Sequence, residues 1–171
     1  FWSWTQGGGV NYFALMSYYL MSPLNFLTVF LPSEWLREFL MFSVVIKVAC
    51  ASMFMAIFLR SLFKKNDFSL VIFGCSFGFC AFFMGYYWNT IWLDTVCITP
   101  LVALGTVKLF TEGKFRLYIV SLALSLLTNY YIGLFACIFV LLSFIAYNIV
   151  KWDGIKKFAT NLLRTGIYSL I

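Results

Sequence analysis

The sequence contains no histidine, three prolines and only six acidic residues among 171. Without histidine, the chain can form neither a Ser-His-Asp nor a Cys-His catalytic system, nor a histidine-ligated zinc site. Charged residues make up 11% of the chain, whereas soluble proteins contain about 25%. This shortage excludes an ordinary soluble domain and an intrinsically disordered segment, which is rich in charge. The five cysteines form no Cys-x-x-Cys pair and lie in apolar stretches, as small hydrophobic residues of membrane helices do.

Apolar and aromatic residues dominate what the chain does contain. Hydrophobic residues make up 63% of it and aromatic residues 22%. A domain of this length could not bury so much apolar surface in water. The net charge of +6 comes from short basic clusters between apolar runs. Membrane topology and anionic lipid headgroups explain such clusters, so they do not indicate nucleic-acid binding. The sequence therefore predicts an all-α polytopic membrane protein, built as a helical bundle in a lipid bilayer.

Five apolar runs are candidate membrane crossings. Three of them are long enough for a hydrocarbon core of about 30 Å. The other two give helices of roughly 21 Å and 18 Å at 1.5 Å per residue, which are too short. The long runs are 39–59, 68–87 and 132–150, and the short runs are 97–110 and 117–128. Because polar backbone at membrane depth must be buried in protein or face water, we expect short or broken helices around an outward-facing cavity.

Basic residues gather in three of the connections between these runs. If all five runs cross, segments 60–67, 108–116 and 151–157 share one side of the membrane, and the positive-inside rule makes that side cytoplasmic. The expected parts are then an extracytoplasmic segment with an interfacial amphipathic helix (1–38), the membrane helices (39–150), and a cytoplasmic basic loop with the start of a further helix (151–171). The chain begins without methionine and stops within an apolar run, so we expect a fragment of a longer protein.

Asp94 is the leading candidate for chemistry. Ionisable groups near membrane depth are costly and tend to be functional. In a partly dry recess, a carboxylate can act as a base or bind a divalent metal such as Mg or Mn. The alternative is a helix N-cap for the run that begins at residue 97, or a loop charge in water. Lys47 lies within an apolar run and either pairs with an acid or a phosphate, or snorkels towards the interface.

Aromatic and amide side chains accompany Asp94 on the expected outer side. Such groups can hold a sugar ring, although each one alone is also explained by an interfacial aromatic belt or a turn. The candidate substrate-binding residues are Asn89, Trp88, Trp92, Asn129, Tyr130, Tyr131, Gln6, Asn11 and Arg37. Gly74 and Gly78 frame a Gly-x-Ser-x-Gly motif, but their place within a span and the absence of histidine favour close helix packing over a nucleophile.

Five segments, in order, resemble the YfhO family of bacterial membrane proteins. They are YYLMSPLN (18–25), NTIWLD (89–94), PLVALG (100–105), GKFRLY (113–118) and NYYIG (129–133). The resemblance implies a glycosyltransferase of the GT-C type, which transfers a sugar from a polyprenyl-phosphate donor, such as an undecaprenyl phosphate sugar, to an acceptor outside the cell. In this family the acceptor is of the teichoic acid class, usually lipoteichoic acid. The resemblance also places the principal catalytic acid before Phe1, which makes Asp94 a second acid.

Two other classes of function stay open at this point. Transporters or flippases for a lipid or a polar solute also use broken helices and polar residues near the membrane midplane. A non-catalytic membrane scaffold would tolerate Asn or Ala at Asp94. Acids and amides on the outer side favour the enzyme, placed in the bacterial cytoplasmic membrane with its active site facing outwards.

Overall fold

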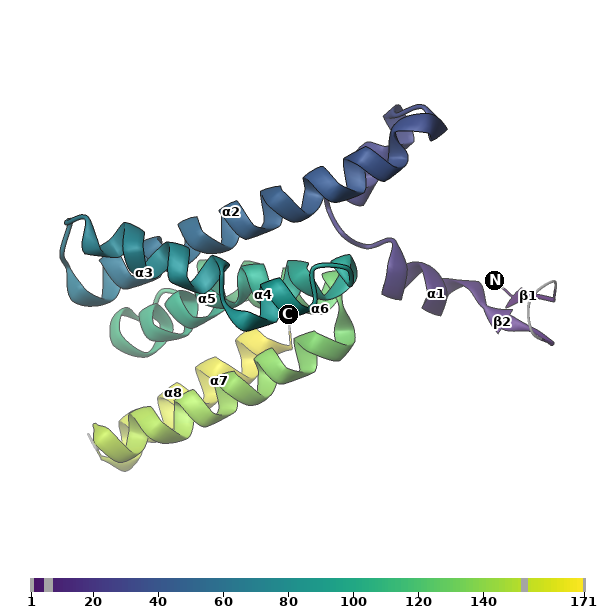
Figure 1. The fold of residues 1–171 in the computed structure, drawn as a ribbon. Coiled ribbons are helices and arrows are strands. Elements are labelled where there is room, and N and C mark those ends of the chain that lie inside the picture. Colours follow the sequence, from purple (N-terminus) through teal and green to yellow (C-terminus); the bar gives the residue numbers. More distant parts are fainter. Residues whose placement is uncertain (1, 5–7, 152–153, 171) are drawn as a thin grey trace.

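Helices make up most of the computed structural model, which describes residues 2–4, 8–151 and 154–170 (Figure 1). The predicted all-α fold class is confirmed. The elements are β1 (Trp2–Ser3), β2 (Val10–Asn11), α1 (Tyr12–Tyr19), the 3-10 helices η1 (Asn25–Phe30) and η2 (Ser33–Trp35), α2 (Leu36–Phe63), α3 (Ser69–Gly78), α4 (Ala81–Gly85), α5 (Thr90–Glu112), α6 (Arg116–Thr128), α7 (Tyr130–Val150) and α8 (Ile155–Ser169).

A short hairpin and α1 extend from one end of the bundle (Figure 1). The two strands pair antiparallel, with Trp2 opposite Asn11. Gly8 and Gly9 have φ of 84° and 115°, a backbone region that side chains other than glycine rarely adopt. The hairpin was not predicted from the sequence. The helix that follows ends at Tyr19, before Pro23.

The long helix α5 is the centre of the bundle. It packs against α2, α6 and α7. Within the described residues, three helical segments are long and apolar enough to cross a membrane, namely Ser33–Phe63, Thr90–Glu112 and Tyr130–Val150. Of these, Thr90–Glu112, which is α5, is the most buried inside the bundle. One core cluster lies among α5, α6 and α7 around Leu109, Tyr118 and Val140. A second joins α2, α4 and α5 around Ala51, Phe83 and Leu93.

The structure corrects two of the predicted spans. The run 97–110 was expected to form a short helix, but α5 begins at Thr90 and has 23 residues, about 34 Å at 1.5 Å per residue. The run 68–87 was expected to cross as one helix, but Phe79 and Cys80 leave the helical conformation and separate α3 from α4. The helix α6, with 13 residues, is short as predicted.

The two ends of the bundle differ in chemistry. The helices α2, α5 and α7 run in the same direction, so their carboxyl ends lie together on the left of Figure 1. We call this the basic end, because Arg60, Lys64 and Lys65 follow or close α2 there and Lys114 and Arg116 follow α5. At the opposite end, which we call the aromatic end, lie the starts of α5 and α7. Which of the two ends faces the cytoplasm stays a prediction.

Two glycines allow α3 to lie close against α2, which confirms their interpretation as packing residues. Gly74 and Gly78 are both buried. A Cβ added at Gly74 would lie 2.6 Å from the backbone oxygen of Ser52 in α2. Since this neighbour is backbone, the contact could be relieved only by moving the helices apart.

We expect Gly74→Ala to destabilise the protein by about 1–3 kcal/mol, because the added methyl group overpacks the α2–α3 contact. The matched control is Gly85→Ala, since a Cβ at Gly85 would meet nothing within 4 Å. Thermal unfolding of the full-length protein in detergent measures both variants. A Gly74→Ala variant as stable as Gly85→Ala would contradict the close approach of the two helices.

Candidate functional site

Asp94 lies in a buried ion pair with Lys47. The Lys47 ammonium contacts Oδ2 of Asp94 at 2.8 Å, and it also donates a hydrogen bond of 2.8 Å to the backbone oxygen of Thr90. Both acceptors belong to α5 and are four residues apart, which puts them on one face of the helix. Lys47 is 3% exposed and Asp94 6% exposed. The pair therefore connects α2 to the second turn of α5 inside an apolar bundle.

This geometry corrects the reading of Asp94 as a helix cap or a loop charge. The segment Trp88–Asp94 was expected to be an outer loop, but only Trp88 and Asn89 precede the helix. The apolar run predicted from the sequence begins only after Asp94, because burying a carboxylate alone is costly. Lys47 supplies the compensating charge from another helix, so α5 continues through this position. Of the two readings of Lys47, the structure shows pairing with an acid.

Aromatic rings gather around Trp92 in the first turn of α5. The indole N–H of Trp92 donates to the hydroxyl of Tyr18 at 3.2 Å. The Trp92 ring lies 5.8 Å from Tyr86 and 6.3 Å from Tyr131, and Tyr18 lies 5.7 Å from Tyr130. These centroid distances are typical of aromatic pairs. The rings come from four separate segments, and together with Trp88 we call them the aromatic cluster.

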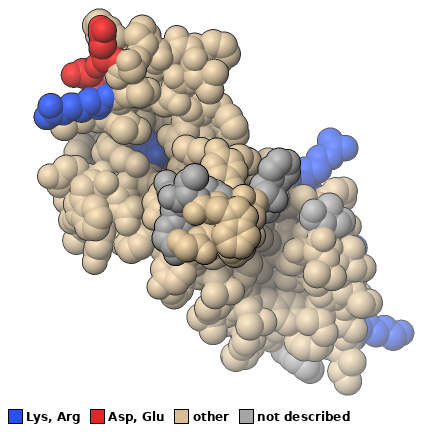
Figure 2. Space-filling model, turned by 90° about the vertical axis from the view of Figure 1, so that its right-hand side faces the viewer, with Lys and Arg blue, Asp and Glu red and all other residues tan. Residues whose placement is uncertain are grey.

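Figure 2 looks onto the right-hand side of Figure 1, from the aromatic end. Charged side chains are visible there at only a few places, and one basic side chain lies within a hollow. Several members of the aromatic cluster remain open to ligands, since Trp88, Tyr130 and Tyr131 are each at least half exposed. The arrangement is an apolar and aromatic surface around the first turn of α5, and the next turn of the same helix carries the buried carboxylate.

A polar seam runs between α5 and α6 next to the ion pair. The hydroxyls of Thr95 and Thr128 lie 3.1 Å apart, and Thr95 also donates to the backbone oxygen of Ser125. Asn129 is fully buried, and its Oδ1 accepts the backbone N–H of Ile132 at the start of α7. The Nδ2 of Asn129 and the Oγ of Ser125 have no hydrogen-bond partner among the described residues. Because unpaired buried polar groups are costly, these two atoms are positions where an internal water would be held.

The remaining predicted residues are distributed unevenly around this centre. Asn89 is half-buried at the entry to α5, and the Trp88 indole donates to the backbone oxygen of Gly85. Asn11 lines a cavity of about 290 Å³ together with Tyr18, Tyr19 and Tyr130. Arg37 is exposed in the first turn of α2, about 15 Å along the helix from Lys47 at 1.5 Å per residue. Gln6 lies outside the described residues.

The surroundings of Asp94 do not suit a divalent metal. Mg²⁺ takes six octahedral oxygen ligands, usually from one or two free carboxylates together with waters and substrate phosphates. Here one carboxylate oxygen is already bound to an ammonium group, and no three His, Cys, Asp or Glu side chains gather anywhere in the described part of the chain. The residues present around Asp94 therefore do not fit the divalent metal, Mg or Mn, that the sequence analysis considered.

Sequence reasoning missed Tyr86, Thr95, Ser125 and Thr128. Tyr86 begins the aromatic triplet that contains Trp88 and could have been noticed from that density. Ser125 and Thr128 lie three residues apart, hence on one face of α6. That spacing predicts a polar face on α6. Nothing in the sequence indicates that Thr95 of α5 packs against this face.

Removal of one member of the ion pair should destabilise the fold more than removal of both. Lys47→Met alone or Asp94→Leu alone leaves an uncompensated buried charge, and we expect each to cost about 3–5 kcal/mol. The double variant should lose markedly less than the sum, and unfolding of the full-length protein in detergent measures all three. Strictly additive losses would show that the two side chains do not interact.

Comparison with known proteins agrees with the membrane architecture. The family model described as bacterial membrane protein YfhO matches residues 1–171. No curated protein and no solved structure matches the chain.

Proposed function

The chain belongs to the YfhO family of bacterial membrane proteins, and we propose that it forms part of a membrane glycosyltransferase of the GT-C type. In this proposal the donor is a polyprenyl-phosphate sugar, such as an undecaprenyl phosphate sugar, and the acceptor is a cell-envelope polymer such as (lipo)teichoic acid. The observation that carries it is the buried carboxylate of Asp94 in the second turn of α5, paired with Lys47, on the helix whose first turn carries Trp92 of the aromatic cluster. The aromatic end then faces outwards from the cytoplasmic membrane, and the basic end faces the cytoplasm.

Asp94 is the carboxylate that we assign to the reaction. In glycosyl transfer, the acceptor oxygen forms a bond to the anomeric carbon, the bond from that carbon to the phosphate oxygen breaks, and the polyprenyl phosphate leaves with the electron pair. The acceptor proton passes to a carboxylate. Asp94 can serve this purpose because Lys47 compensates its charge within the bundle and a small part of it remains exposed. An acid upstream of Phe1, which the family resemblance implies, would share this work.

The surrounding groups suit the two substrates. The rings of Trp88, Trp92, Tyr130 and Tyr131 can stack on a sugar ring, and the half-buried amide of Asn89 can hydrogen-bond its hydroxyls. Asn129 is fully buried and positions the start of α7, which carries Tyr130 and Tyr131. Arg37 is exposed at the start of α2, where its guanidinium group can bind the phosphate of the incoming donor. The cavity beside Asn11 extends the aromatic end towards α1. In this proposal the polyprenyl chain stays in the bilayer beside the bundle.

The test of this function follows a labelled polyprenyl-phosphate hexose supplied to membranes that contain the full-length protein. Wild type should transfer label to teichoic acid, and Asp94→Asn should lower transfer at least about 100-fold, the scale of acid–base catalysis. The matched control is Asp67→Asn, which makes the same chemical change at an exposed aspartate of the basic end. It should transfer like wild type.

A second variant separates chemistry from folding. Lys47→Gln/Asp94→Asn replaces the ion pair by two neutral amides, so it should recover stability without recovering transfer. Transfer that survives in Asp94→Asn would make Asp94 a structural residue. Wild type that transfers none of several sugars would refute the enzyme and favour a transporter or a flippase.

Trp92 should contribute to substrate binding more than to the rate of the chemical step. Since an aromatic contact is worth about 0.5–1.5 kcal/mol, Trp92→Leu should raise KM by roughly 2–10-fold with kcat little changed. Trp35→Leu is the control, because Trp35 is 62% exposed and lies outside the aromatic cluster. Equal KM for wild type and Trp92→Leu would remove this indole from the binding surface.

A further inference from the structure

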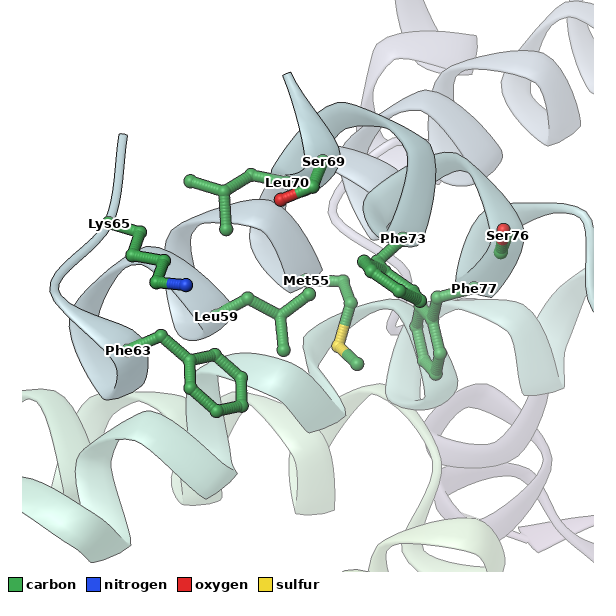
Figure 3. Close-up of a pocket in the computed structure, with 9 residues that line it drawn as sticks. All are labelled: Met55, Leu59, Phe63, Lys65, Ser69, Leu70, Phe73, Ser76 and Phe77. Carbon is green, nitrogen blue, oxygen red and sulfur yellow. The ribbon is translucent and has the colours of Figure 1, made fainter. Parts of the chain in front are cut away.

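A second cavity lies at the basic end, away from the aromatic cluster. It has a volume of about 630 Å³, within the range of about 300–1,000 Å³ that is common for ligand sites. Its walls come from the last turns of α2 and from α3 (Figure 3). The apolar side chains that line it are Met55, Leu59, Phe63, Leu70, Phe73 and Phe77. An apolar interior of this kind suits a hydrocarbon chain, and a methionine in the wall adapts readily to its shape.

A single cation lines this groove among its mostly apolar walls. Lys65 belongs to the lining, and its side chain extends the ammonium over the groove (Figure 3). Within the described residues, no carboxylate lies within ion-pair distance of Lys65. Asp67, the nearest acid along the chain, accepts a hydrogen bond from the hydroxyl of Ser69. Lys64 adds a positive charge to the same connection, and Arg60 adds another from the last turn of α2.

We infer that this groove binds an anionic phospholipid of the bilayer. The acyl chain lies between α2 and α3 along the apolar side chains, and the headgroup phosphate meets the ammonium of Lys65. Charge complementarity selects this occupant, because a basic segment next to a membrane helix attracts anionic headgroups at about 1 kcal/mol per Lys or Arg. A zwitterionic lipid offers the same hydrocarbon but no net negative charge.

This lipid site is distinct from the proposed reaction centre. Met55 and Phe63 lie 8 and 16 residues beyond Lys47 on the same continuous helix, which corresponds to roughly 12–24 Å along its axis. The groove also lies against α3, which ends before the break that leads to α4. A lipid held there joins the basic ends of α2 and α3, where few other elements contact α3.

The test uses the full-length protein purified from mixed vesicles of phosphatidylglycerol and phosphatidylcholine, with the retained lipids counted by native mass spectrometry. Wild type should retain phosphatidylglycerol in preference to phosphatidylcholine. Lys65→Gln should lower retained phosphatidylglycerol about fivefold, the effect of one basic residue near a headgroup. The matched control is Lys156→Gln, which removes the same charge from an exposed position on α8 and should leave retention unchanged.

A steric variant tests the groove without changing charge. Leu59→Trp should fill the cavity and lower retention, whereas Ile57→Trp, on the same helix but outside the lining, should not. Three results would each overturn the inference: equal retention of the two lipids by wild type, equal losses in Lys65→Gln and Lys156→Gln, or retention by Leu59→Trp that matches wild type. The last of these would also be the result if another segment of the full-length chain covered the groove.

Discussion

A carboxylate and an ammonium can share the interior of an apolar bundle only when each compensates the charge of the other. Lys47 and Asp94 do this at 2.8 Å, and much of the bundle's arrangement follows from the pair. It fixes the rotation of α2 against α5, because both charges must face the same contact. It also allows α5 to begin at Thr90 and reach a length that spans a bilayer. The pair lies beside the second core cluster, in which Ala51, Leu93 and Cys97 exclude water.

The same pair gives the aromatic end its chemical character. Rings from α1, α5, α7 and the segment before α5 converge on Trp92, one turn or less from Asp94. The polar seam of Thr95, Ser125 and Thr128 continues from there into the α5–α6 contact. Farther along, α5 and α6 approach so closely that a Cβ at Gly105 would lie 2.7 Å from the backbone of Tyr118. The helix that carries the carboxylate is therefore held rigidly on three sides, which is what a site of defined geometry requires.

The sequence predicted the fold class, the family and most helices, because hydropathy is a strong signal where backbone groups must be satisfied internally. It located α6 and α7 closely, since their apolar runs are bounded by Arg116, Asn129 and Lys151. It misplaced the start of α5, because the partner that allows Asp94 to be buried lies 47 residues away in the chain. It also missed the break between α3 and α4, where no proline or charged residue marks the interruption.

For the candidate site, residue type was more predictable than geometry. Asp94, Trp92, Asn129 and Tyr131 could be proposed because acids, amides and aromatic residues cluster at the ends of the apolar runs. Arg37 was proposed for its charge alone, and the helix rise puts it about 15 Å from Lys47. The opposition of Thr95 to Thr128 depends on how two helices cross, which short-range patterns do not encode.

The most direct test of this account is an experimental map of the full-length protein in a lipid nanodisc, at a resolution that shows side chains. The account predicts that Lys47 Nζ lies within hydrogen-bond distance of Asp94 Oδ2, about 3 Å, with residues 90–96 helical and Trp92 between Tyr86 and Tyr131. A helix that begins near residue 97, with Asp94 in a solvated loop and Lys47 directed elsewhere, would contradict it.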